Sequence, residues 1–186
     1  MTISTTARRF ARWAVVPAAV GLGLGLTALA APSAEAAAHS CHGYRATIVG
    51  TNGSNDIEGT SGRDVIVALG GHDEIDGNGG NDIICAGAGN DEVDGGAGND
   101  WIDGGSGHDD LEGSSGRDTV KGGSGNDHVE GESGRDRVYG NSGRDLVEGG
   151  TAKDTVSGGS GADVVKQKYA TERQEDRWED QNRFDD

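Results

Sequence analysis

The sequence predicts an all-β fold built from short stacked strands, and three observations carry this prediction. Residues 50–166 divide into thirteen nine-residue units without an insertion or a deletion, which is the pattern of a repeat architecture. Each unit has Asp or Asn at its sixth position and an aliphatic residue at its eighth. Glycine accounts for 35 of the 186 residues and hydrophobic residues for only 32%, so a conventional large globular core is excluded.

The composition also narrows the classes of partner. The chain has 32 Asp and Glu residues against 16 Lys and Arg, a net charge of -16, which argues against nucleic acid. Two prolines and the lack of a Gly-X-Y run exclude collagen. Such a composition usually indicates a disordered chain, but disorder does not require the strict period that this sequence has.

Residues 1–38 have the pattern of a secretory signal peptide. Three arginines (Arg8, Arg9 and Arg12) precede an apolar stretch at residues 13–31, and small residues follow it. A permanent membrane anchor is the weaker alternative, because the stretch contains Pro17 and three glycines. No other apolar segment follows, so we expect a secreted, extracellular protein with no membrane span in the mature chain.

Within residues 50–166 each position of the unit has its own physical role. Position 1 is Gly in eleven units and position 4 is Gly in twelve, which suits a tight turn that needs positive φ and close backbone approach. Positions 7 to 9, such as Glu92-Val93-Asp94, predict a short strand whose middle side chain points to one face. One inward aliphatic residue cannot form a core alone, so the units must stack into a ladder of Val and Ile.

The unit Gly95-Gly96-Ala97-Gly98-Asn99-Asp100-Trp101-Ile102-Asp103 resembles the RTX or hemolysin-type calcium-binding nonapeptide repeat. That resemblance implies a right-handed parallel β-roll, a β-solenoid in which two repeats make one coil. Odd-numbered units would build one sheet of short strands and even-numbered units the other.

The resemblance also implies the metal and its ligands. Ca²⁺ would lie between turns stacked on the same side, held by turn carbonyl oxygens and the position-6 aspartates, since Ca²⁺ takes six to eight oxygen ligands. Seven odd and six even turns allow up to eleven ions, and Asn55 and Ala152 put the sites at unit 1 and around unit 12 in doubt. The implied ligands are Asp64, Asp73, Asp82, Asp91, Asp100, Asp109, Asp118, Asp127, Asp136, Asp145, Asp154 and Asp163.

The two outer faces are predicted to differ. The outward positions of the first odd units are all acidic, whereas those of units 2, 4 and 6 include Val65, Ile83 and Trp101. An exposed apolar patch usually has a cover or a partner, and the flank at residues 39–49 is the nearest candidate cover. We expect a disulfide between Cys41 and Cys85 in an oxidising compartment, with two unpaired thiols or pairing between chains as the alternatives.

Residues 167–186 leave the repeat and are expected to form a polar tail that either caps the last coil or stays solvated. His72, His108 and His128 are interpreted as loop or surface residues. The chain has no catalytic motif of the His-Glu-x-x-His or Gly-x-Ser-x-Gly type, so we do not expect an enzyme. The favoured function is a secreted calcium-binding protein with a structural or adhesive role. The alternative is a binder of a cell-surface protein or polysaccharide in which calcium only supports the fold.

Overall fold

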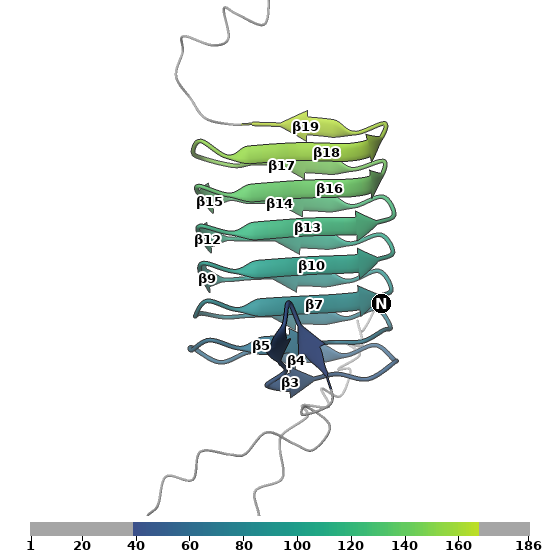
Figure 1. Ribbon diagram of the computed structural model, residues 1–186, viewed down its shortest axis with the longest axis vertical. Helices are drawn as coiled ribbons and strands as arrows, with labels where there is room; N and C mark the ends of the chain where they lie inside the picture. Colours follow the sequence, from purple (N-terminus) through teal and green to yellow (C-terminus); the bar gives the residue numbers. More distant parts are fainter. Residues whose placement is uncertain (1–38, 168–186) are drawn as a thin grey trace, which may run out of the picture.

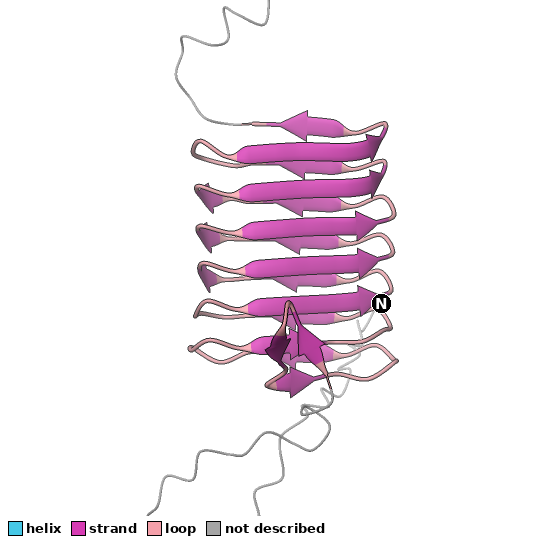
Figure 2. Ribbon diagram, in the orientation of Figure 1, coloured by secondary structure: helices cyan, strands magenta, loops and turns pink. Residues whose placement is uncertain are grey.

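The computed structural model describes residues 39–167, and within them every regular element is a strand (Figures 1 and 2). The strands stack into a parallel β-roll, as the repeat predicts. The expected signal peptide at 1–38 and nearly all of the tail at 167–186 lie outside the described residues. Residues 39–167 contain no helix long and apolar enough to cross a membrane.

Two seven-stranded parallel sheets form the roll. The first sheet contains β3 (Ile48–Val49), β5 (Val65–Val67), β7 (Ile83–Ala88), β10 (Trp101–Ser106), β13 (Thr119–Ser124), β16 (Arg137–Gly143) and β18 (Thr155–Gly161). The second contains β4 (Asp56–Glu58), β6 (Glu74–Asp76), β8 (Glu92–Asp94), β11 (Asp110–Glu112), β14 (His128–Glu130), β17 (Leu146–Glu148) and β19 (Val164–Lys166). A small third sheet in the turns joins β9 (Ala97–Gly98), β12 (Ser115–Gly116) and β15 (Ser133–Gly134).

The register of both large sheets advances by eighteen residues from one strand to the next. Ile102 lies opposite Ile84 on one side and Val120 on the other, so each even unit pairs only with even units. Leu111 pairs in the same way with Val93 and Val129 of odd units. The predicted division of odd and even units between two sheets is therefore confirmed.

The core consists of the position-8 side chains, which stack along the axis of the roll between the two sheets. Ile66, Ile84, Ile102, Leu111 and the four valines from Val120 to Val147 are fully buried and form one continuous cluster. Each coil contributes only two of these residues, because the neighbouring positions 7 and 9 point outward. The interior is therefore thin.

The roll begins one strand earlier than the repeat count indicates. Ile48 and Val49 pair in parallel register with Ile66 and Val67, so they act as the eighth and ninth positions of a unit before the first. The amino-terminal part of the flank instead forms a hairpin of β1 (Ser40–Cys41) and β2 (Tyr44–Arg45). The flank at 39–49 thus combines an outer hairpin with the first strand of the roll.

The hairpin covers the apolar patch on the first sheet. Cys41 and Ala46 are buried against Val65, Val67 and Ile83 in a second apolar cluster. The tight turn has positive φ at His42 and Gly43, and the His42 ring stacks on Trp101 with ring centroids 4.2 Å apart. The structure thus places an intramolecular cover where an exposed patch was expected to need one.

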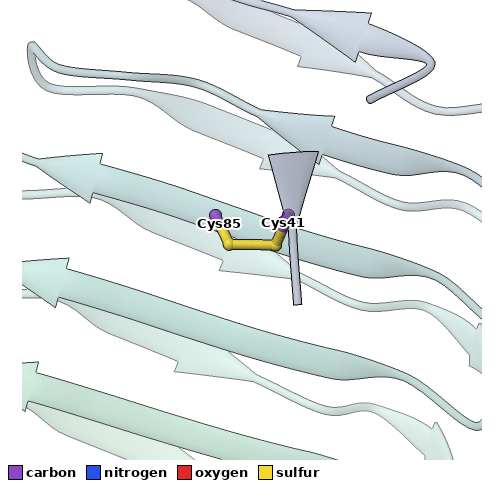
Figure 3. Close-up of a disulfide and its surroundings, with 2 residues drawn as sticks. All are labelled: Cys41 and Cys85. Atoms are coloured by element: carbon purple, nitrogen blue, oxygen red, sulfur yellow. A yellow bond between two sulfur atoms is a disulfide. The ribbon is translucent and has the colours of Figure 1, made fainter. Parts of the chain in front are cut away.

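A disulfide between Cys41 and Cys85 fixes this hairpin to β7 (Figure 3). The bond closes a loop with a sequence separation of 44 residues, and the described residues contain no free cysteine. Because it joins the flank to the second coil, it holds the amino-terminal end of the roll together.

Candidate metal centres

The position-6 aspartates lie at the ends of the roll's cross-section, in the turns that join the two sheets. Eleven of the twelve predicted ligands are buried, and the last one, Asp163, is half-buried in the final turn. Within each side of the roll the aspartates of successive turns are eighteen residues apart and therefore stand in a row along its axis. The structure brings the predicted ligands together as two such rows.

One carboxylate oxygen of every position-6 aspartate after Asp64 ties its turn to the preceding turn on the same side. The backbone N–H of Asp100 donates to Asp118 Oδ1 at 2.9 Å, and that of Asp82 donates to Asp100 Oδ1 at 2.7 Å. The same bond recurs along both rows, through to the donation from Asp145 N–H to Asp163 Oδ1. Every such turn thus needs an oxygen acceptor at position 6 of the next turn.

The other carboxylate oxygen has no hydrogen-bond partner. An isolated buried carboxylate oxygen is costly because it has lost its water without gaining a donor. Ten aspartates leave Oδ2 buried in this way: Asp73, Asp82, Asp91, Asp100, Asp109, Asp118, Asp127, Asp136, Asp145 and Asp154. A bound cation would supply the missing partner at each of these oxygens.

A backbone carbonyl from the next turn approaches the same place. A Cβ built on Gly122 would lie 2.5 Å from Asp127 Oδ2 and 2.8 Å from the carbonyl oxygen of Gly140, and Gly113 sits in the same relation to Asp118 and Gly131. The absent side chain of the position-1 glycine thus leaves a cradle in which two negatively polarised oxygens converge. Seven aspartates share this complete arrangement: Asp82, Asp100, Asp109, Asp118, Asp127, Asp136 and Asp145.

The donor set fits Ca²⁺. Carboxylate and carbonyl oxygens are its usual ligands, and it accepts irregular geometry, whereas the turns offer no thiolate. When bound, the ion would supply positive charge between stacked turns. The chain's own contribution is to hold Oδ2 of one turn and the carbonyl of the next in a water-poor position.

Without the ion, burial raises the pKa of eight of these carboxyl groups: Asp73, Asp82, Asp91, Asp100, Asp109, Asp118, Asp127 and Asp136. Desolvation raises the pKa of Asp118 to about 7 and those of Asp100 and Asp109 to about 6, from an ordinary value of 3.8. The backbone hydrogen bond from Asp100 opposes this rise at Asp118, while the charges of Asp100 and Asp136 add to it. The metal-free rows therefore carry mutual repulsion at neutral pH.

Acidification is expected to restore structure to the calcium-free chain. Since these pKa values are raised in the folded state, the roll binds more protons than the unfolded chain between about pH 4 and 7. Its stability is therefore greatest below the unfolded pKa of 3.8 and is lost as the pH rises through about 6 to 7. Circular dichroism of calcium-depleted protein between about pH 8 and 4 should show an increase in β signal on acidification. An unchanged or falling signal would contradict the repulsion described above.

The first two turns are built differently. Asn55 Oδ1 accepts the N–H of Thr51 at 2.6 Å, and Asp64 Oδ2 accepts both the N–H and the hydroxyl of Thr60, at 2.7 and 2.8 Å. Gly53 and Gly62 at position 4 also lack the positive φ of the later turns. Threonine at position 2 is the sequence feature that distinguishes these two units from the later ones, and the repeat motif does not account for it. Both carboxylate oxygens of Asp64 thus have donors within the protein, unlike the ten aspartates whose Oδ2 has no partner.

A second ladder runs through position 5, and it includes two histidines interpreted from sequence as loop or surface residues. His72 Nδ1 accepts the N–H of Asn90 at 2.8 Å, Asn90 Oδ1 accepts that of His108 at 3.0 Å, and His108 Nδ1 accepts that of Asn126 at 2.8 Å. These exposed side chains therefore help to fix the spacing of the turns. The even units form the same ladder through Asn81, Asn99 and the N–H of Arg117, so Asn or His at position 5 is the signal for this role in the sequence.

Parallel coils with rows of buried carboxylates in their turns define the chain as a parallel β-roll with the features of a metal-binding protein. The family model described as RTX calcium-binding nonapeptide repeat (4 copies) matches residues 49–84, 85–111, 103–138, 112–147 and 139–165. The chain therefore belongs to the family of RTX calcium-binding nonapeptide repeat proteins. A comparison with curated proteins finds no match.

Proposed function

We propose that this protein is a secreted calcium-binding protein whose repeats fold around Ca²⁺ and that it has a structural or adhesive role outside the cell. The observation that carries the proposal is the set of ten buried Oδ2 atoms without a partner. Up to eleven ions follow from the number of turns, and the seven complete cradles are the best-formed sites. Each bound ion would join one turn to the next turn on the same side of the roll.

Secretion is supported by two features of the chain. Residues 1–38 have the pattern of a signal peptide, and the Cys41–Cys85 disulfide belongs to an oxidising compartment. Extracellular calcium is also plentiful enough for modules that bind it with dissociation constants of about 0.1 to 1 mM. Such a chain would complete its fold after export.

The alternative role is binding a protein or polysaccharide, with calcium only supporting the fold. The apolar patch around Val65, Ile83 and Trp101 gives this role no support. The hairpin at residues 40–45 now covers Val65 and Ile83, and Trp101 stacks on His42. Retention of the protein on producing cells, with and without calcium, tests the adhesive role directly.

Calcium binding is tested by equilibrium dialysis of the secreted protein with radioactive Ca²⁺. We expect several ions per chain, and Asp118→Asn should lower either the number of ions or their affinity. The amide side chain of this variant would keep an Oδ1 acceptor for the N–H of Asp100, so the hydrogen bond between turns survives while one anionic ligand is lost.

The matched control is Asp103→Asn, which removes a carboxylate from the outer face of β10 and should leave calcium binding unchanged. Equal calcium binding by the wild type and both variants would contradict the assignment of the position-6 aspartates. A wild-type protein that binds no Ca²⁺ at millimolar concentration would refute the proposed function.

A further inference from the structure

The outer face of the second sheet carries a cluster of metal-ligating side chains away from the turns. His128 and Glu130 lie on β14, and parallel pairing sets Asp110 of β11 opposite His128 and Glu148 of β17 opposite Glu130. Lys166 of β19 continues the column beyond Glu148. The side-chain ligand atoms of His128, Glu130 and Glu148 all lie within 4.8 Å of one another.

His128 is held between two carboxylates. Its Nδ1 lies 3.0 Å from Asp110 Oδ1, and its Nε2 lies 2.8 Å from Glu130 Oε1. Nε2 is buried and makes no contact of hydrogen-bond geometry. If Nδ1–H donates to Asp110, the lone pair of Nε2 faces an anionic oxygen, and this arrangement is repulsive unless a cation lies between them.

Glu148 makes the cluster more acidic and less hydrated. It is only 7% exposed, although it is on an outer face, and Lys166 Nζ lies 2.6 Å from its Oε1. Like charges directly opposite on neighbouring strands destabilise a sheet, and here Glu130 and Glu148 are directly opposite. Lys166 offsets part of this repulsion from the far side, and its half-exposed side chain has room to swing outward.

We propose that His128, Glu130 and Glu148 form a binding site for one Zn²⁺ ion on the outer face of the roll. One imidazole nitrogen with two carboxylates suits zinc, which binds such ligands at about 2.0 to 2.2 Å in a tetrahedral arrangement. The imidazole disfavours Ca²⁺, which selects oxygen. Asp110 orients the ring through Nδ1, the usual role of a carboxylate behind a zinc-bound histidine. The ion would join β14 to β17, and therefore two successive coils.

Zinc titration of calcium-saturated protein, followed by isothermal calorimetry, tests the site while the turns are occupied. We expect one zinc ion per chain and loss of that ion in His128→Gln and in Glu148→Gln. Asp110→Asn should weaken zinc binding about 10- to 100-fold, because it only removes the group that orients the ring. Lys166→Met should tighten binding, because it removes the ammonium group that competes for Glu148.

Glu92→Gln is the matched control, since it neutralises a carboxylate on the same face at β8 and should leave zinc binding unchanged. The β signal in calcium should be the same for all five variants, which separates loss of a ligand from loss of the fold. Unchanged zinc binding in His128→Gln overturns the proposal. So does a wild-type protein that binds no zinc, in which case His128 only packs between Asp110 and Glu130.

Discussion

Removal of calcium is expected to abolish most of the β structure of residues 39–167. An ion present at ten times its dissociation constant stabilises the folded state by about 1.4 kcal/mol, so seven sites would contribute about 10 kcal/mol. A typical domain has a net stability of only about 5 to 15 kcal/mol. The roll has a thin core and ten buried carboxylate oxygens without partners, so it has little to replace this contribution.

Circular dichroism at neutral pH, with a chelator in excess, measures this effect. The β signal should fall and return when Ca²⁺ is added beyond the chelator. Mg²⁺ is the control ion and should not restore it, because Mg²⁺ demands regular octahedral geometry and retains its water. A chelated protein that keeps its native spectrum would show that the turns are stable without an ion.

Gly107→Ala is expected to disrupt the roll even in saturating calcium. Gly107 stands at position 4 of the seventh unit with φ of 141°, and a Cβ there would overlap the carbonyl oxygen of Gly89 in the turn beneath. The backbone cannot move away without breaking the stacking of the two turns. Strain at such a position costs about 1 to 3 kcal/mol, and the overlap adds to it. We expect a higher calcium requirement for folding and a lower melting temperature.

Gly62→Ala is the matched control, because Gly62 holds the same position in the second unit. It has no positive φ, and the nearest atom to a built Cβ is Thr60 Oγ1 at 3.9 Å. Its melting temperature should therefore stay close to that of the wild type. Equal melting temperatures of the two variants would show that close stacking at position 4 does not determine the stability of the roll.

The architecture was predictable because a nine-residue period leaves few alternatives. Aliphatic residues such as Ile102 and Val120 had to stack, since each unit has only one of them, and the division into odd and even units then fixed which strands pair. The structure confirms the β-roll, and the family match covers the same repeats. The apolar outer positions of the first even units also pointed to a cover near Cys85.

Features that break the period were harder to predict. The additional strand at Ile48–Val49 lacks the aspartate and glycines of the motif, and only its pairing with Ile66 and Val67 reveals its role. The metal-site interpretation treated Asp64 like its neighbours, because it did not consider that Thr60 donates two hydrogen bonds to it. The contacts of His128 involve a strand eighteen residues away in sequence, so no local motif predicts them.

The two ends of the roll differ in what they need from the solvent. At the amino-terminal end, Thr51 and Thr60 complete the turns with their own hydrogen bonds, and the Cys41–Cys85 link secures the same region. From the third turn onward, ten turns leave a buried carboxylate oxygen that a bound cation would satisfy. We therefore expect the first coils to form before the later ones, so that assembly proceeds toward residue 166 as calcium becomes available.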